Sequence, residues 1–423
     1  MNDARYYLQQ VWSESKLFRY LLGITVVYAL LRLLLQAVLL VGLLWYGPEY
    51  DFPVIPVDLQ VYVDASARLA ARQDLYLQGP ITRLEELYQY TPSFALAFTP
   101  FYRLYRRSPG AVSFIHTALH MLAYGLLYLR WVAIFKRLKL TAANRMLART
   151  LPLWLVYSAF WDDLLYLNVY IITALLATLL IEALLAARLG RSVGWLVVIL
   201  QIKPFWAFAA AALPPAKQFK FFLRLVLWGA VGYVAVAGIT ALAVGPRYGW
   251  QQHADYVAFL LRLSREFPWR GPEAPFLGYN HSIKQILFYG LGVTPGAALL
   301  ATGVKGLLLA PLAMVYLRRL THPADEQTPR RVLEFALALY LGAFIWLDMV
   351  WELTLSIAIF PYLLATCRHR GARALMCALF LPYALLDAWR LVSVAIFGTG
   401  VILPGLYLTT DPNIYAPLIM ALN

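Results

Sequence analysis

The chain is poor in charged residues and nearly free of cysteine. Only 14% of its 423 residues are Asp, Glu, Lys or Arg, whereas 61% are hydrophobic. Soluble domains have roughly 25% charged and about 45–50% apolar residues, so an ordinary soluble domain is excluded. The two cysteines, Cys367 and Cys377, flank a basic segment. Neither a disulfide nor a metal cluster is expected from them.

Several motifs of soluble enzymes are also missing. The sequence has no Walker-type loop, no Gly-x-Gly-x-x-Gly opening a helix, no Cys-His metal pattern and no serine nucleophile elbow. A nucleotide-dependent mechanism therefore lacks support. No cofactor and no metal are expected.

Long apolar segments dominate what is present. Segments 21–46, 113–135, 165–187, 221–244 and 374–397 approach or exceed the roughly 20 apolar residues that cross a bilayer. They predict an all-α polytopic integral membrane protein with roughly 10–13 transmembrane or re-entrant helices.

The net charge is +14, and the basic residues are distributed as in a membrane protein rather than as in a nucleic-acid-binding protein. Lys and Arg cluster at the ends of apolar segments, as membrane orientation requires, so no nucleic acid is expected as a partner. Arg5, Lys16 and Arg19 precede the first apolar segment, which is too long for a cleavable signal peptide. We expect a multi-pass protein of the inner (plasma) membrane, with its N-terminus in the cytoplasm.

The predicted first extracytoplasmic loop, residues 47–90, contains an acidic residue close to a membrane span, where a charge is energetically unfavourable without a partner. Asp58 stands soon after the first apolar segment, where a carboxylate needs water, a partner or a substrate. From Asp58 to Arg72, apolar residues recur at helical spacing. This pattern predicts a short amphipathic helix lying on the outer leaflet.

Two segments read as broken helices. Segment 91–107 is short and contains Pro92 and Pro100, and segment 194–214 is interrupted at Lys203-Pro204. At membrane depth such breaks occur where they are buried in protein or line an aqueous cavity. We divide the chain into a catalytic module, 1–215, and a C-terminal module, 216–423, with a second outer loop at 245–282. Its part 262–280 is rich in Pro, Gly and charge and predicts a mobile flap.

The outer-facing motifs, taken in order, resemble the GT-C superfamily of polyprenol-phosphate-sugar-dependent glycosyltransferases, and glycosyltransferase family 87 within it. The motifs are Asp58-Leu59-Gln60-Val61-Tyr62, Asp74-Leu75-Tyr76, 90–94 with Thr99-Pro100, 158–168, Lys203-Pro204, 280–283 and 346–352. The chain departs from that family where Leu167-Asn168 replaces a Gly-Gln-x-Asn pattern, and where Trp351-Glu352 replaces late histidines.

The resemblance implies an inverting membrane glycosyltransferase with an extracytoplasmic active site. Its donor would be a polyprenyl-phosphate sugar, with mannose first and a pentofuranose second. Its acceptor would be a hydroxyl of a glycolipid or cell-envelope glycan. The resemblance gives Asp58 the role of general base, because a hydroxyl must lose its proton as it attacks. The alternative is that Asp58 only caps the amphipathic helix.

The departing phosphate needs cationic or N–H donors. Lys203 is the first candidate, and the alternative is a lysine that snorkels to the interface. Asn280, His281, Ser282 and Lys284 open a helix whose free N–H groups suit the donor phosphate. An ordinary helix cap is the alternative for Asn280 and Ser282.

Further acidic and aromatic residues are candidates for contact with the acceptor or the sugar. They are Asp64, Asp162, Asp163, Asn168, Trp346, Asp348, Trp351 and Glu352. Asp64 has the alternative of an i,i+4 pair with Arg68. Asp348 and Glu352, four residues apart, are predicted to share one helical face, with pairing to an arginine as the alternative.

Two rival functions stay open from the sequence. One is a flippase or transporter of a lipid-linked sugar, since broken helices and intramembrane charge suit transport as well. The other is an inactive GT-C-like scaffold. A transporter often has repeated halves and midplane charges, whereas here the acidic residues gather toward one surface and no repeat is visible.

Overall fold

A computed structural model describes residues 2–45, 56–76, 87–274, 280–321, 328–350 and 354–397. Within these ranges the chain forms α-helices, one 3₁₀ helix and no strand, which confirms the all-helical class. The elements are α1 (Asn2–Glu14), α2 (Lys16–Trp45), α3 (Val57–Ala70), α4 (Pro92–Ala97), α5 (Thr99–Tyr105), α6 (Pro109–Arg137), α7 (Thr141–Arg149), α8 (Leu151–Val156), α9 (Ser158–Tyr166), α10 (Tyr170–Leu185), α11 (Leu189–Ile202), η1 (Pro204–Ala212), α12 (Phe219–Val244), α13 (Pro246–Glu266), α14 (Ile283–Leu291), α15 (Pro295–Thr321), α16 (Thr328–Trp346), α17 (Ser356–Thr366), α18 (Arg370–Ala384) and α19 (Leu386–Phe397).

Four of the described helices are long and apolar enough to cross a membrane. They are α2 over Lys16–Val38, α6, α12 and α15, and a bent pair, Leu151–Tyr166 with Tyr170–Leu185, makes a fifth if it is one span. The protein is therefore a helical multi-pass membrane protein. The predicted number of roughly 10–13 membrane-crossing or re-entrant segments is larger. Two of the predicted spans are broken: 165–187 at residues 167–169, and 374–397 at Leu385.

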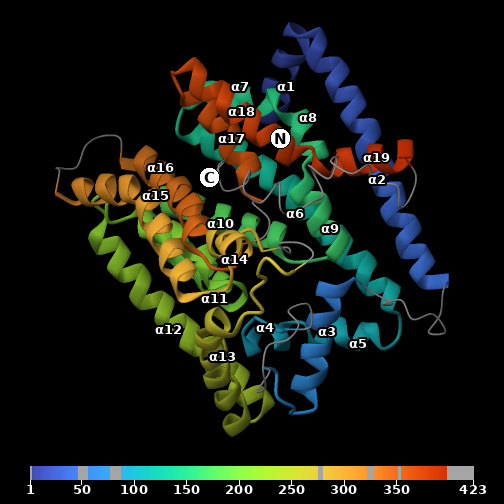
Figure 1. The fold of residues 1–423 in the computed structure, drawn as a ribbon, viewed down its shortest axis with the longest axis vertical. Coiled ribbons are helices and arrows are strands. Elements are labelled where there is room, and N and C mark those ends of the chain that lie inside the picture. The colour runs from blue at the N-terminus through green and yellow to red at the C-terminus, as the bar shows by residue number, and fades with distance from the viewer. Residues whose placement is uncertain are drawn as a thin grey trace.

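The spans differ in how they are packed. α6 lies half buried among α2, α7 and α10, whereas α2, α12 and α15 expose most of their apolar side chains. In Figure 1, α2 runs along one edge and α12 along the opposite edge, with α6, α10 and α11 between them. Exposed apolar helices at the edges of a bundle are what a surrounding lipid phase stabilises.

Both breaks predicted from proline are present. Segment 91–107 forms α4 and α5, with Thr91 capping α4 by accepting a hydrogen bond from the Phe94 N–H. Segment 194–214 forms α11 and then η1, and Lys203 stands between them with an extended backbone (φ −139°, ψ 95°). The extended residue before Pro204 is expected, because proline disfavours the α conformation in the residue before it.

The amphipathic helix predicted after Asp58 is α3, but its apolar face does not meet lipid. Leu59, Tyr62 and Leu69 are buried. They pack in the main core, and α3 lies against α4 and α5. The prediction that α3 rests on the outer leaflet is therefore wrong, because the face that would insert is already covered by protein.

The segment predicted as a second outer loop, 245–282, is more ordered than expected. Residues 246–266 form α13, so the first five residues of the predicted flap 262–280 are helical. Residues 275–279 of that flap lie outside the described part of the chain.

Candidate functional site

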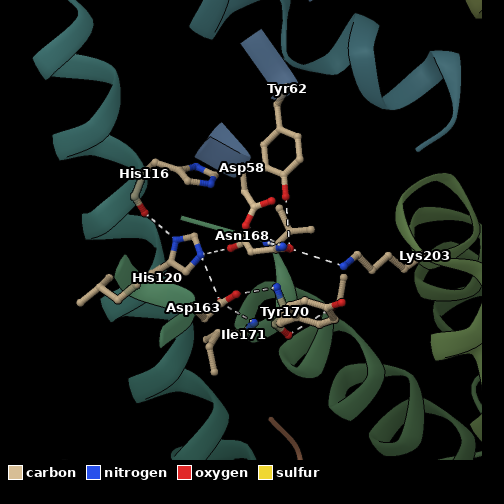
Figure 2. A network of polar contacts seen from close by, with 12 residues as sticks. Asp58, Tyr62, His116, His120, Asp163, Asn168, Tyr170, Ile171 and Lys203 are labelled. Carbon is tan, nitrogen blue, oxygen red and sulfur yellow. Dashed lines mark hydrogen bonds and ion pairs between the residues drawn. The ribbon is translucent and has the colours of Figure 1, made fainter. Parts of the chain in front are cut away.

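A network of polar side chains forms where α9 and α10 meet (Figure 2). Leu167 has the left-handed conformation (φ 52°), and Asn168 follows it in the turn. The Asn168 Nδ2 donates to Asp58 Oδ2 at 3.0 Å, and the Lys203 Nζ donates to Asn168 Oδ1 at 3.4 Å. The turn thus brings together three residues that the sequence placed far apart: the first-loop aspartate, the amide and the lysine at the helix break.

Tyrosines complete this network. The Tyr62 and Tyr90 hydroxyl oxygens are 2.9 Å apart, and they approach Asn168 Oδ1 to 3.2 and 3.4 Å. The Lys203 Nζ lies 3.4 Å from the centroid of the Tyr170 ring and 5.5 Å from that of Tyr90. Aromatic faces attract a cation. The ammonium group is therefore held by two rings and an amide, near the carboxylate of Asp58.

A buried Asp–His pair fixes the turn that carries Asn168. The Asp163 carboxylate accepts from the backbone N–H groups of Tyr170 at 3.2 Å and Ile171 at 2.9 Å, so it caps α10. The His120 Nε2 lies 3.3 Å from Asp163 Oδ2 and also hydrogen-bonds the Asn168 carbonyl oxygen. Asp163 is 2% exposed. Its contacts position the turn, and Asp162 beside it on α9 is also buried.

Sequence reasoning missed His116, His120 and Tyr170. The two histidines lie four residues apart in α6, the span predicted at 113–135, and both are buried. A pair of imidazoles at helical spacing inside an apolar segment was the available signal, because polar residues there are costly unless they have partners. Nothing local marks Tyr170, which is placed under Lys203 only by the packing of α10 on α11.

Burial changes the proton affinity of both ends of the network. It raises the pKa of Asp58 to about 6, although the Lys203 charge and the Asn168 hydrogen bond oppose the rise. It lowers the pKa of Lys203 to about 7, against the attraction of Asp58 and Asp163. A carboxylate with a pKa slightly below neutral can accept a proton in a reaction and remain ionised before it.

Asp58 does not cap α3. The N-cap residue is Pro56, which makes no side-chain capping bond, and Asp58 stands in the first turn with its Oδ2 accepting from Asn168. Asp64 is exposed further along α3, where it accepts from the Gln60 side chain at 2.6 Å. Its expected partner Arg68 instead donates to the Leu75 carbonyl at 3.3 Å. Asp64 therefore lies outside the network.

Asp348 organises a second cluster. Its two oxygens accept from Lys284 at 3.0 Å and Lys305 at 2.5 Å, and Ser264 donates to it at 2.7 Å. The Lys284 Nζ also lies 4.4 Å from the Trp269 ring. These contacts join α13, α14, α15 and the end of α16, and none involves Asp58, Asn168 or Lys203. Lysines, rather than the arginine considered above, are the partners.

The prediction that Asp348 and Glu352 share a helical face is wrong, because α16 ends at Trp346 and Asp348 lies in the following turn. Trp346 is largely exposed. Trp351 and Glu352 lie outside the described residues.

Three of the four residues predicted at the start of α14 make hydrogen bonds with backbone groups. Asn280 donates to the Asp348 carbonyl at 2.8 Å and accepts from the Val350 N–H at 3.0 Å. The His281 N–H donates to the Val350 carbonyl at 2.8 Å. Ser282 caps α14 by accepting from the Gln285 N–H at 3.1 Å. The cap alternative thus describes Ser282, whereas the Asn280 side chain binds the backbone of Asp348 and Val350.

An apolar groove begins beside Lys203. It has a volume of about 480 Å³ and runs between α11, η1 and α12. Its lining includes Leu196, Leu200, Pro204, Val226, Tyr233 and Val234. Pro204, which follows Lys203 in the chain, lines the groove, but the residues of the polar network are not among its lining residues.

Comparison of the chain with known protein families, curated proteins and solved structures finds no match. Among the described residues, no three His, Cys, Asp or Glu side chains gather closely enough to hold a metal ion.

Proposed function

We propose that the protein is an inverting membrane glycosyltransferase that moves a sugar, mannose in the first instance, from a polyprenyl phosphate to a hydroxyl of a glycolipid or cell-envelope glycan. The observation that carries the proposal is the pairing of Asp58 and Lys203 through one amide, that of Asn168. A base for the acceptor and a cation for the leaving group are the two groups that this chemistry requires.

In the proposed reaction the acceptor oxygen attacks the anomeric carbon of the sugar while its proton passes to Asp58. The bond between that carbon and the phosphate oxygen breaks, and the phosphate leaves with the electron pair. The Lys203 ammonium stabilises the charge that develops on it. Asn168 hydrogen-bonds both side chains, so that each is oriented for its own end of the transfer.

The apolar groove supports a lipid-linked donor. Pro204 lines the groove and directly follows Lys203 in the chain, so a prenyl chain in the groove would lie against the residue next to the lysine. Burial of each CH₂ group of such a chain contributes about 0.8 kcal/mol. This arrangement accounts for a lysine at a helix break without a nucleotide-binding motif.

The proposal is tested with purified protein, radiolabelled polyprenyl-phosphate-mannose and a crude lipid extract. We expect labelled lipid product from the unmodified protein. Asp58→Asn should lower its rate by about 10²-fold or more, the usual contribution of a general base. Asp64→Asn, an acidic neighbour outside the network, is the matched control and should leave the rate unchanged. Full turnover by folded Asp58→Asn protein would remove Asp58 from the role of base.

Transport is the second candidate, because two broken elements, α9–α10 with a bend of 116° and α11–η1, meet at the network. The same donor distinguishes the two functions when it is placed in one leaflet of liposomes. Movement of intact donor to the other leaflet, without labelled product, supports transport. A scaffold without activity gives neither result.

A further inference from the structure

Helix α13 has two apolar faces, and only one of them is buried within the part of the chain that the structure describes. His253, Tyr256, Phe259 and Leu263 are buried against the body. On the other side, five exposed residues form a continuous row, here called the outer stripe: Trp250, Ala254, Val257, Ala258 and Leu261. Trp250, Val257 and Leu261 are 48%, 53% and 67% exposed, a large apolar area for one helix to leave open.

The outer stripe is continuous with the lipid-facing surface of α12. Gly245 turns the chain between the two helices with a φ of +106°. At Gly249 a Cβ atom would lie 2.4 Å from the Ala241 Cα, so the start of α13 packs closely on the last turns of α12. Trp250 lies against Gly238. The neighbouring Leu242 of that candidate span is 74% exposed.

The charged residues of α13 favour a position of this helix at the membrane boundary rather than in the membrane interior. The helix is not among the candidate spans and carries five charged residues, at 247, 255, 262, 265 and 266. Arg247 and Arg265 are exposed beyond the two ends of the outer stripe. Apolar rows flanked by arginine, with a tryptophan at the edge, are typical of helices that lie in the interface plane.

We propose that α13 is an interfacial helix whose outer stripe inserts at the boundary between lipid head groups and acyl chains. This inference stands independently of the proposed catalytic activity. It commits to lipid as the occupant of the stripe because the stripe extends the surface of a membrane span.

The proposed contact would also fix the height of the Asp58 network relative to the membrane. The rings of Tyr256 and Phe259 lie 5.7 and 5.8 Å from that of Tyr76, whose hydroxyl donates to the Tyr90 carbonyl at 2.7 Å. Tyr90 in turn approaches Asn168. A short chain of contacts therefore runs from the buried face of α13 to the network.

The test uses full-length protein in phospholipid liposomes, with Cys367 and Cys377 replaced by serine and a spin label on one introduced cysteine. Ala254→Cys and Ala258→Cys sample the outer stripe. Leu242→Cys on α12 is the lipid control, and Ala142→Cys, exposed on the polar helix α7, is the water control. Collision with oxygen, which concentrates in lipid, is compared with collision with a water-soluble nickel chelate.

We expect the oxygen-to-nickel collision ratio at positions 254 and 258 to resemble that of Leu242. A ratio like that of Ala142 would overturn the proposal. Spin–spin broadening between copies that disappears on dilution with unlabelled protein would also overturn it, by assigning the stripe to a second copy of the chain. Size-exclusion profiles and thermal unfolding verify that each labelled protein is folded.

Discussion

At the scale of single residues, Asn168 decides how the network works. A neutral amide offers donors on its nitrogen and acceptor positions on its oxygen. It therefore satisfies the Asp58 carboxylate with Nδ2 and the Lys203 ammonium with Oδ1 at the same time. An aspartate at this position could only accept, and it would leave two carboxylates facing each other.

The pH dependence of turnover follows from these two groups. Turnover should rise as Asp58 loses its proton near pH 6 and fall as Lys203 loses its proton near pH 7, which gives a narrow bell. Because the groups interact, the two apparent pKa values belong to the pair. Initial rates of sugar transfer from about pH 5 to about pH 9 measure the curve, because the pKa values of both groups lie inside this range.

Lys203→Arg tests whether Lys203 causes the alkaline fall of this pH–rate profile. A guanidinium keeps its charge throughout this range, so the alkaline fall should disappear while the acidic rise remains. An alkaline fall that persists unchanged in Lys203→Arg protein would assign it to another group.

At the scale of elements, the left-handed turn between α9 and α10 is the feature on which the network depends. The turn exposes the N–H groups at the start of α10, and Asp163 accepts from two of them. The same carboxylate pairs with His120 of α6, so three helices are fixed around Asn168. A carboxylate at a helix N-terminus is also favoured by the helix dipole.

Asp163→Ala should destabilise this turn. The substitution removes a helix cap and leaves buried N–H groups without acceptors, which together cost about 1–3 kcal/mol. Thermal unfolding followed by helical circular dichroism measures the loss. Asp163→Asn keeps one acceptor oxygen of similar shape and should lose less. Equal melting temperatures for Asp163→Ala and the unmodified protein would show that the cap contributes nothing.

At the scale of the whole molecule, one ion pair joins the first span to the last described helix. Arg32 of α2 donates to both oxygens of Asp387 of α19, at 2.7 and 3.0 Å, and the Tyr28 hydroxyl bonds the same carboxylate. The Arg32 guanidinium also lies 5.4 Å from the Trp161 ring. Since most of α2 is exposed, this pair is a principal polar attachment of the helix to the body.

Arg32→Met should destabilise the protein by about 3 kcal/mol, because it leaves a buried carboxylate without its partner. The double variant Arg32→Met/Asp387→Leu removes both charges and should recover most of the loss. Thermal unfolding of Arg32→Met, Asp387→Leu and the double variant, compared with the unmodified protein, gives the double-mutant cycle. Additive losses, with no recovery in the double variant, would mean that the ion pair does not couple α2 to α19.

The membrane class, the all-helical fold and the two proline breaks could be predicted from the sequence, because they depend on local composition and local backbone preferences. Asp58 and Lys203 were also identified from the sequence, since charged groups in apolar surroundings stand out without any coordinates, and Asn168 was identified through the resemblance to a known family. Assignments that depended on which face of a helix meets protein, such as α3 on lipid, were wrong.

Which polar residues meet could be learned only from the three-dimensional packing of the helices. Asp64 and Asp348 look as suitable in the sequence as Asp58, yet one is exposed on α3 and the other is neutralised by two lysines. His120, Asp163 and Tyr170 enter the network from separate elements, with no local signal of their meeting. Contacts between distant segments depend on how whole helices pack, and that packing is a sum of many weak apolar contacts that no short motif encodes.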